Sequence, residues 1–424
     1  MALDLLKELA NRGLLAQVSH KEELRDHLSS GNRTVYCGFD PTAESLHIGN
    51  LVPLLTLRRF QEHGHTPLIL IGGATGLIGD PSGRSDERNL NSESVVETWV
   101  ANIREQAKYF LDFDGDNAAL IVNNLDWTRN RDVISFLRDV GKHFSVNQMV
   151  QRDSVKSRLE RDGEGISYTE FSYMLLQAND YAELAENHRC TIQIGGSDQW
   201  GNIVSGMDLV RRRASVEAFA ITMPLVTKAD GTKFGKSAGG SIWLDPQLTS
   251  PYSFFQFWYN TADLDIEAYL KTFTFLPLDE INNLVKMTME RPEQRLAQRA
   301  LAREITILVH GVEAADSSAR ISRCLFEGEV SGLVEPDYKQ LKLDGVGATR
   351  IEIESIGLLD AIVSSGLATS RGAARKLVQG KGISLNGKIQ SDLEFNLSPK
   401  NAAFGKYHLL RKGKKNWHLL FYDT

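Results

Sequence analysis

An α/β fold built on a doubly wound parallel sheet is predicted by two features of the sequence. Apolar runs of strand-like composition recur at residues 34–39, 66–71 and 191–194. Each run ends in a glycine-containing turn that leads toward a helical pattern, such as the apolar spacing of residues 51–63. Repetition of strand, turn and helix favours a parallel sheet covered by helices. Ligands in such sheets bind at the carboxyl ends of the strands, so candidate site residues are expected there.

The first strand and the turn after it carry the first candidates. Side chains alternate along a strand, so Tyr36, Gly38 and Asp40 share one face, where glycine leaves a gap between two polar groups. That face is a candidate pocket wall, although a tyrosine at a sheet edge explains the spacing equally well. His47 and Gly49 follow in the turn that opens the helix. Free amides and the positive helix end suit a polyphosphate there, whereas a lone His-x-Gly is more often a surface or capping feature.

A second motif, Lys233-Phe-Gly-Lys236-Ser237, follows an Asp-Gly turn far along the chain. Two lysines three residues apart, with glycine between them, suit a loop that closes over an anionic phosphate. Most Lys-x-x-Lys loops are instead solvated surface, and the motif by itself does not decide between the two.

Two further stretches supply polar candidates. Tyr173, Gln177 and Asp180 are spaced by four and three residues, which places them on one helical face. That face could bind a ligand or simply be solvated. Asp80 ends the glycine-rich stretch 72–80, which fits neither phosphate-binding glycine motif. Asp80 is therefore either a site residue at a strand end or a turn-forming aspartate before proline.

Charge is distributed unevenly along the chain. Residues 355–424 carry 11 lysines and arginines against 4 acidic residues, a net charge of +7, so the first 354 residues carry −13 of the total of −6. A basic tail on an acidic body indicates one module that meets a phosphate backbone. The three isolated cysteines indicate a reducing compartment without structural zinc. No apolar run could span a bilayer and no signal-peptide pattern begins the chain, so a cytoplasmic protein is expected.

Together the motifs resemble a known family. The pair His47-Ile-Gly49-Asn50 and Lys233-Phe-Gly-Lys236-Ser237 resembles the "HIGH" and "KMSKS" signatures of class I aminoacyl-tRNA synthetases. Residues 36–42 (Tyr-Cys-Gly-Phe-Asp-Pro-Thr) and 195–202 (Gly-Gly-Ser-Asp-Gln-Trp-Gly-Asn) closely resemble the bacterial tyrosyl-tRNA synthetase family. Asn50 departs from the second histidine of the first signature, and Phe-Gly departs from Met-Ser in the second, but both lysines are kept.

The resemblance implies a role for each matching residue. Tyrosine would be bound by Tyr36, Asp80, Tyr173, Gln177, Asp180 and Gln199. The catalytic phosphate donors would be Thr42, His47, Lys233 and Lys236. ATP would further contact Asp40, Gly49, Asn50, Gly196, Asp198, Lys236 and Ser237. It implies ATP as a substrate with Mg²⁺, no prosthetic group, no protein metal site and no membrane association, with tRNA(Tyr), L-tyrosine and a second copy of the chain as partners.

The resemblance, together with the low periodicity and the Gly, Pro and charge content of residues 331–354, divides the chain into four regions. A Rossmann-like catalytic domain would cover 1–245, with a connective insertion at about 125–165 that contributes to a dimer interface. A helical anticodon-recognition domain would cover 246–330, followed by a linker at 331–354. Residues 355–424 resemble a small α+β RNA-binding domain named after a ribosomal protein. Its RNA-binding residues would be Arg371, Arg375, Lys376, Arg411, Lys412, Lys414 and Lys415. The first 32 residues are expected to be helical and peripheral.

Three other functions remain open at this point. A tryptophanyl enzyme would share the fold and the phosphate motifs, but Tyr36 and Asp180 fit a phenol better than an indole. A small-molecule nucleotidyltransferase uses a similar histidine turn and would not need the basic tail. A non-catalytic RNA-binding paralogue would not need to keep Asp40, His47, Lys233 and Lys236.

Overall fold

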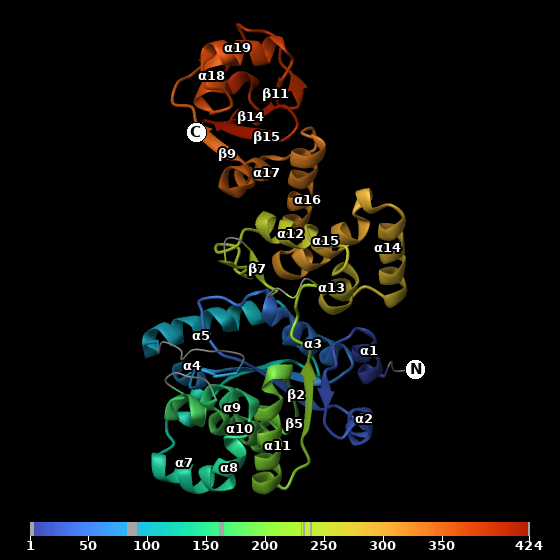
Figure 1. Cartoon of the computed structure of the whole chain (residues 1–424), viewed down its shortest axis with the longest axis vertical. Helices are drawn as coiled ribbons and strands as arrows, with labels where there is room; N and C mark the ends of the chain where they lie inside the picture. Colours follow the sequence, from blue (N-terminus) through green and yellow to red (C-terminus); the bar gives the residue numbers. More distant parts are fainter. Residues whose placement is uncertain are drawn as a thin grey trace. The chain divides into compact units, whose positions relative to one another are not determined.

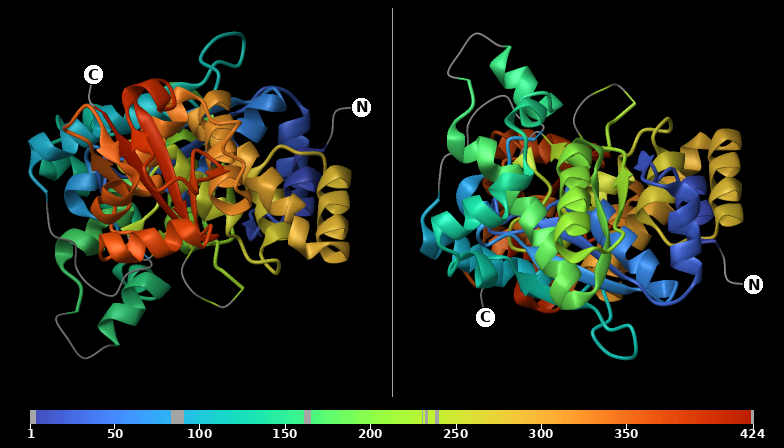
Figure 2. Two further views of the ribbon diagram at one scale, coloured as in Figure 1. Left: turned by 90° about the horizontal axis from the view of Figure 1, so that it is seen from above. Right: turned by 90° about the horizontal axis from the view of Figure 1, so that it is seen from below.

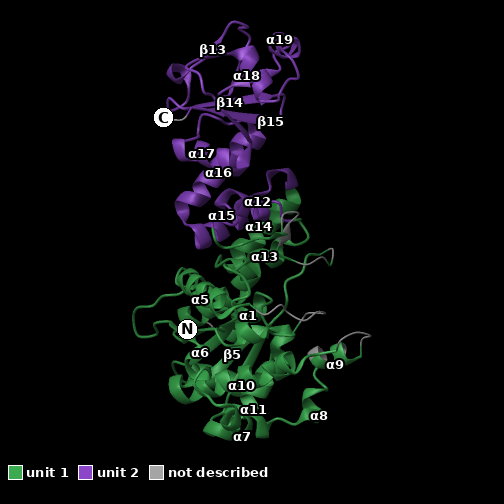
Figure 3. Cartoon of the chain, turned by 90° about the vertical axis from the view of Figure 1, so that its left-hand side faces the viewer, with its two compact units in different colours: residues 1–245, 262–290 green, residues 246–261, 291–424 purple. Residues whose placement is uncertain are grey.

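The computed structural model describes residues 4–82, 91–160, 165–229, 231, 234–237 and 240–422, with the backbone alone at Asp153, Ser154, Ser157, Lys236 and Ser237. The chain divides into two compact units (Figure 3). Unit 1 comprises residues 1–245 and 262–290, and unit 2 comprises residues 246–261 and 291–424.

Unit 1 is built on a six-stranded sheet in the order β1-β6-β5-β2-β3-β4. Strands β2 to β6 are parallel, and only the short β1 runs antiparallel, along β6. This confirms the doubly wound parallel sheet and the predicted bounds of β2 and β3. The strands are β1 (Gln17–Val18), β2 (Thr34–Phe39), β3 (Thr66–Ile71), β4 (Leu120–Asn123), β5 (Cys190–Gly196) and β6 (Phe219–Met223), with a separate hairpin of β7 (Lys236–Ser237) and β8 (Gly240–Ser241).

Helices cover both faces of this sheet. Figure 1 shows α3 and α5 on one side and α10 and α11 on the other, and the view from below in Figure 2 looks onto the green helices of the second layer. No helix in the described ranges is long and apolar enough to cross a membrane. The helices of unit 1 are α1 (Leu5–Asn11), α2 (Lys21–Ser29), α3 (Leu51–Glu62), α4 (Thr75–Ile78), α5 (Glu93–Ala107), α6 (Leu125–Thr128), α7 (Val133–Asp139), α8 (Val146–Met149), α9 (Asp153–Leu159), α10 (Tyr168–His188), α11 (Trp200–Ala214), α13 (Ile266–Phe273) and α14 (Leu278–Glu290).

The order of the strands fixes where a ligand can bind. The chain passes from β2 to β3 and β4 in one direction, then returns to place β5 on the other side of β2. The connections after β2 and β5 therefore diverge, and this opens a crevice at the carboxyl ends of these two strands. Several candidates named from the sequence, such as Asp40 and Asp198, follow these two strands.

The N-terminal residues are less peripheral than predicted. In α1, Leu5, Leu6 and Leu9 are buried, and β1 pairs with the sheet edge. The guanidinium of Arg12 is also buried and donates to the carbonyls of Lys271, Thr274 and Leu276. The short α1 contributes to the core of unit 1 because one turn of leucines is sufficient to form an apolar face.

Residues 262–290 were predicted to belong to the helical domain, but they group with unit 1. The carboxyl end of α13 explains this placement. Besides Arg12, the buried Arg59 of α3 donates to the carbonyls of Thr272 and Thr274 and lies over the ring of Phe275. Two cations thus satisfy the free carbonyls at the end of α13 and join it to the core of unit 1.

Unit 2 contains a helical part and a five-stranded sheet in the order β12-β11-β14-β15-β9. The predicted linker at 331–354 is wrong, because α17 buries Asp337 and Tyr338 and β9 pairs with β15. Short elements of this kind leave little periodicity in the sequence. The elements are α12 (Pro251–Tyr259), α15 (Leu296–His310), α16 (Val312–Glu327), α17 (Glu335–Gln340), β9 (Gly347–Arg350), β10 (Ile356–Gly357), α18 (Leu358–Ser364), α19 (Arg371–Gln379), β11 (Ile383–Leu385), β12 (Lys388–Ile389), β13 (Asn396–Leu397), β14 (Tyr407–Lys412) and β15 (Asn416–Phe421).

Candidate active site

A cavity of about 630 Å³ lies in unit 1 at the crevice between β2 and β5. We call it the switch-point cavity. Its walls come from β2, the turn before α3, the face of α10 and the turn after β5. Segments far apart in the sequence are thus brought together as the sheet topology requires. The predicted residues that line it are Tyr36, Asp40, Thr42, His47, Gly49, Asn50, Asp80, Tyr173, Gln177, Asp180, Gly196, Asp198 and Gln199.

One part of the cavity combines a phenol with a fixed carboxylate. The two oxygens of Asp180 accept hydrogen bonds from Asn124 Nδ2 at 2.9 Å and Trp127 Nε1 at 2.8 Å. The hydroxyl of Tyr36 is buried and has no hydrogen-bond partner among the described residues. An unpartnered buried hydroxyl is costly, so a polar group of a ligand would satisfy it. Burial raises the pKa of Asp180 to about 7.

A network of buried polar groups runs from Asp180 toward Asp40. Asn124 donates to both Asp180 and the hydroxyl of Thr75. Thr75 and Tyr173 then donate to the two carboxylate oxygens of Asp40, at 2.6 and 2.7 Å. Each side chain in this hydrogen-bonded network is held by its neighbour, so the carboxylates of Asp40 and Asp180 keep a fixed orientation.

A second set of contacts holds the opposite wall. Gln199 donates to Asp80 at 2.7 Å, and Gln177 donates to Gln199 at 3.2 Å. Asn202 in turn donates to Gln177 at 3.0 Å. The predicted tyrosine-binding residues Asp80, Gln177 and Gln199 therefore form one hydrogen-bonded group with Asn202.

The histidine turn has a defined proton arrangement. The amide of Gly49 donates to His47 Nδ1 at 3.1 Å, which leaves Nε2 to carry the ring proton. Burial lowers the pKa of His47 from its ordinary value of 6.5, so the ring is neutral at pH 7. A Cβ at position 49 would lie 2.8 Å from His47 Cε1, which explains the glycine. Asn50 Oδ1 accepts the amide of His47, so the departure from the signature caps the turn.

Backbone hydrogen bonds connect this turn to the lysine motif. Ile48 donates to the carbonyl of Ile242, and Ile242 donates to the carbonyl of Gly235. His47 also forms a β-bridge with Trp243. Lys233 lies outside the described residues, and Lys236 and Ser237 are described by the backbone of β7 alone. The structure thus brings the backbones of the two motifs together and leaves the roles of the lysine side chains as predictions.

The described lining of the switch-point cavity is acidic. It contains Asp40, Asp80, Asp180 and Asp198, and no lysine or arginine among the lining residues that the structure describes. Burial also raises the pKa of Asp198. Such a lining offers acceptors to a cation such as an ammonium group, whereas a polyphosphate would need positive charge from elsewhere.

The predicted RNA-binding residues all lie in unit 2, but their surroundings differ. Arg371, Arg375 and Lys376 are exposed on α19, and Lys414 and Lys415 are exposed in the turn between β14 and β15. Arg371 also pairs with Asp360 at 3.2 Å. Arg411 and Lys412 are less exposed and are engaged within the domain. The Arg411 guanidinium lies over the ring of Trp417, and Lys412 donates to the carbonyl of Leu367. Lys412, Lys414 and Lys415 line a second cavity of about 860 Å³.

Comparisons with known proteins identify the family of this chain. The family model described as "tRNA synthetases class I (W and Y)" matches residues 29–327. The model of the "Tyrosine--tRNA ligase SYY-like C-terminal domain" matches residues 337–420. A tyrosine–tRNA ligase of Salmonella paratyphi B is 52% identical to this chain over 418 residues, or 98% of both chains. The chain belongs to the tyrosine–tRNA ligase family.

Solved structures of aminoacyl-tRNA synthetases share the fold of this tyrosine–tRNA ligase family member. The C-terminally truncated mitochondrial tyrosyl-tRNA synthetase of Aspergillus nidulans is 32% identical, with a TM-score of 0.70 over 76% of this chain and 94% of that chain. A tryptophanyl-tRNA synthetase of Encephalitozoon cuniculi has a TM-score of 0.53 at 15% identity, over 73% of this chain and 87% of that chain. At that identity the second likeness shows the fold alone.

Sequence reasoning about this family member missed Thr75 and Trp127. Thr75 connects Asp40 to Asn124, and Trp127 donates to Asp180. Trp127 lies on the short α6 that follows β4, and no spacing in the sequence marks it. Family membership also removes the basis for a nucleotidyltransferase or a tryptophanyl enzyme as the main interpretation.

Proposed function

We propose that this chain activates L-tyrosine with ATP and transfers the tyrosyl group to the 3′ end of tRNA(Tyr). In the first step a carboxylate oxygen of tyrosine attacks the α-phosphorus, the bond to the bridging oxygen of the β-phosphate breaks, and pyrophosphate leaves. In the second step a terminal ribose hydroxyl of the tRNA attacks the acyl carbon, and AMP leaves. The substrate supplies the nucleophile in the first step, so catalysis consists of positioning and electrostatic stabilisation.

The observation that carries this proposal is the meeting of Tyr36 and Asp180 in the cavity that also contains His47. A tyrosine phenol donates one hydrogen bond and accepts another. The fixed carboxylate of Asp180 fits the first, and the unpartnered hydroxyl of Tyr36 fits the second. An indole offers a single N–H donor and no oxygen acceptor, so it would leave the Tyr36 hydroxyl unsatisfied.

The remaining roles follow from the charge of the cavity. We assign the substrate ammonium to Asp80, Tyr173, Gln177 and Gln199, which supply acceptors at neighbouring positions. Asp40, Gly49, Asn50, Gly196, Asp198 and Ser237 would contact the nucleoside part of ATP. Thr42, the Nε2–H of His47 and the side chains of Lys233 and Lys236 would donate to the phosphates.

Magnesium is proposed to accompany ATP. The phosphates carry the negative charge that the acidic lining cannot balance, and Mg²⁺ is ordinarily held by substrate phosphates and water with one or two carboxylates. Asp40, Asp80 and Asp198 are carboxylates of the cavity lining that would supply such a contact. A reducing cytoplasm suits the three cysteines, which are buried as free thiols.

Pyrophosphate exchange across the twenty amino acids tests the proposal. Exchange of labelled pyrophosphate into ATP is expected with L-tyrosine and to be at least about 100-fold weaker with phenylalanine, because the missing hydroxyl leaves buried polar groups unpaired. Exchange with tryptophan is the matched comparison, because tryptophanyl enzymes share this fold. Equal exchange with tryptophan and tyrosine, or no exchange with tyrosine, would refute the assignment.

Transfer RNA binding is assigned to unit 2, with its helices on the anticodon side and the basic residues of 355–424 on the backbone. The Lys414→Ala/Lys415→Ala variant is expected to raise the tRNA KM and to reduce the salt slope of tRNA binding by about 1.5 to 2, one phosphate contact for each lysine. Pyrophosphate exchange should not change. Lys400→Ala, another exposed lysine of the same domain, is the control. An unchanged salt slope in the double variant would remove this role.

A homodimer is proposed through the insertion between β4 and α10. Val133 and Ile134 are each 71% exposed and Val146 is 60% exposed, which is unusual for a group of branched apolar residues. Ile134→Asp is expected to convert a dimer to a monomer in sedimentation velocity. Leu264→Asp is the control, since Leu264 is 85% exposed elsewhere in unit 1. A parent chain that sediments as a monomer contradicts the proposal.

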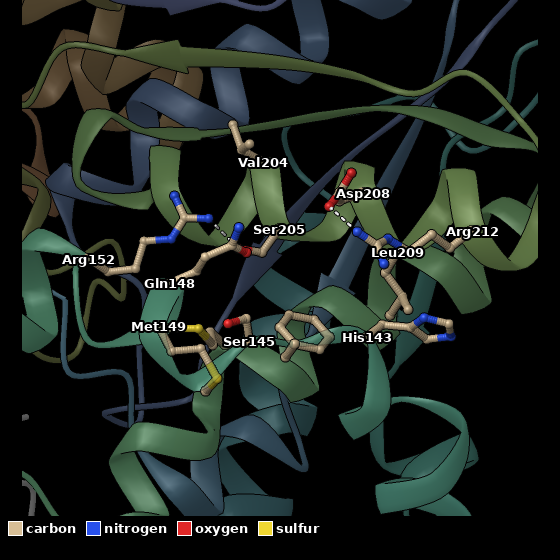
Figure 4. A pocket seen from close by; sticks show the side chains of 12 residues that line it. His143, Ser145, Gln148, Met149, Arg152, Val204, Ser205, Asp208, Leu209 and Arg212 are labelled. Carbon is tan, nitrogen blue, oxygen red and sulfur yellow. Dashed lines mark hydrogen bonds and ion pairs between the residues drawn. The ribbon is translucent and has the colours of Figure 1, made fainter.

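A small cavity of about 70 Å³ adjoins this region, between α8 and α11 (Figure 4). Arg152 donates to the hydroxyl of Ser205 across it, and Arg212 pairs with Asp208 on its rim. Its wall includes Phe144 and Met149, so the insertion packs against α11 through both polar and apolar contacts.

A further inference from the structure

The turn before His47 is held from outside by α5. Gln106, in the last turn of α5 (Figure 1), uses both ends of its amide. Its Oε1 accepts the backbone N–H of Leu46 at 2.8 Å, and its Nε2 donates to Ser45 Oγ at 3.0 Å. One turn earlier, Asn102 donates to the carbonyl of Glu44 at 3.1 Å. The three residues that precede His47 are therefore all fastened to one helix.

Ser45 extends this contact to the chain that follows the lysine motif. Its side chain is 4% exposed. The hydroxyl donates to the carbonyl of Leu46 at 2.8 Å and accepts the backbone N–H of Asp245 at 3.2 Å. Leu244 also donates to the carbonyl of Leu46 at 2.9 Å. Leu46 is thus fixed at its N–H by α5 and at its carbonyl by Ser45 and Leu244.

The same segment continues into the lysine motif. Ile242 accepts the amide of Ile48 at 3.0 Å and donates to the carbonyl of Gly235 at 3.1 Å. Gly235 lies within the motif, between Phe234 and Lys236. An unbroken series of hydrogen bonds therefore connects Gln106, the His47 turn, residues 242–245 and the backbone of the lysine motif.

We propose that Gln106 is a positioning residue that keeps the His47 turn and residues 242–245 in one fixed geometry. Gln106, Ser45 and Leu46 are absent from the lining of the switch-point cavity, so the amide acts through the turn and not on the substrate. The proposal rests on the proposed function, because it assigns a purpose to the geometry of the phosphate-binding groups.

The expected effect is confined to the phosphate side of the reaction. A displacement of about 1 Å in a catalytic group can reduce a rate by about 100-fold. Gln106 touches neither Tyr36 nor Asp180, which lie on β2 and α10. Loss of the amide should therefore lower kcat for pyrophosphate exchange and leave tyrosine binding unaltered.

Gln106→Leu keeps the size of the side chain and removes both hydrogen bonds. It is expected to lower kcat for exchange by about 10- to 100-fold, with the tyrosine dissociation constant by calorimetry within 2-fold of the parent. Gln106→Glu keeps an acceptor for the Leu46 amide and can accept the Ser45 hydroxyl proton, so it should recover most of the rate. Glu105→Ala is the control, since it removes only the exposed ion pair with Lys108.

Hydrogen exchange provides a readout that does not depend on activity. In Gln106→Leu the amides of residues 44–48 and 242–245 should exchange faster together, by at least 10-fold, whereas β2 should keep its protection. Unchanged exchange in both segments, or a kcat within 2-fold of the parent in the folded variant, would overturn the proposal. A parent protein without tyrosine-dependent exchange would refute the proposed function instead, and the amide measurement would still decide whether Gln106 holds the turn.

Discussion

Replacement of His47 by alanine is expected to lower kcat for tyrosine-dependent pyrophosphate exchange by about 10²–10³, the usual cost of one transition-state donor. The Gly49 amide occupies Nδ1, so the proton on Nε2 is the group available to the phosphates. The ring is neutral at pH 7 because burial lowers its pKa, and it acts as a hydrogen-bond donor rather than a charge. Steady-state exchange with saturating tyrosine measures the loss.

Two amide substitutions at position 47 distinguish the roles of the two ring nitrogens, Nδ1 and Nε2. Glutamine can place an N–H near the position of Nε2, so His47→Gln should recover part of the rate. Asparagine places its N–H near the position of Nδ1, so His47→Asn should not. The reverse order, or an alanine variant within 5-fold of the parent, would contradict the assigned role. Lys236→Ala should show a loss of the same size, because its ammonium is assigned to the same phosphates.

Replacement of Asp180 by asparagine is expected to reduce kcat/KM for tyrosine by about 10- to 100-fold, through KM. An asparagine side chain has one accepting oxygen and one donating NH2 group. It could therefore no longer accept hydrogen bonds from Asn124, Trp127 and the substrate phenol together. Phenylalanine has no hydroxyl to bind, so its kcat/KM should change little. The ratio of kcat/KM for tyrosine to kcat/KM for phenylalanine should therefore fall by a similar factor. Glu186→Gln removes one charge from the same helix outside the cavity and serves as the control.

The same variant should alter how stability depends on pH. The pKa of Asp180 is about 7 in the folded protein, against 3.8 in the unfolded chain. The folded state therefore binds a proton between these values that the unfolded state has released. The stability from this group is full below about pH 4 and is lost as the pH rises through 7. Asp180→Asn removes this loss, so its Tm should gain on the parent between pH 5 and 8. A parallel pair of Tm curves would show that Asp180 is ionised throughout.

The strands and the cavity could be predicted because their signals are local or topological. Runs such as 34–39 are apolar on both faces, as buried parallel strands are, and parallel strands bring their carboxyl ends to one edge. Asp40 and Asp80, which follow β2 and β3, could thus be expected near one another, whereas Asp180 lies on α10 and was named from the family resemblance. The glycine-rich stretch after β3 was weak evidence as a motif. Glycine is required at position 72 for a steric reason, since a Cβ there would lie 2.0 Å from Asp40 Oδ1.

The remaining features depend on contacts that no local pattern encodes. Arg12 and Arg59 are buried, although arginine is ordinarily exposed, because each finds carbonyls at the end of α13. Without those partners in view, α13 could not be assigned to unit 1. Trp127 and Gln106 were missed for the same reason, since an indole or amide in a short or amphipathic helix has no distinguishing spacing. The roles of the lysine side chains stay predictions.

The fluorescence of Trp127 is expected to report ligand binding in the switch-point cavity. The ring donates to Asp180 from the wall where the phenol is proposed to bind, so a ligand there changes the polarity around a natural fluorophore. The emission of this half-buried indole would shift or be quenched in proportion to the filled fraction, and Trp127→Phe would remove that signal from the spectrum while the other tryptophans remain. Titration with unlabelled substrate in a cuvette would then yield the occupancy directly.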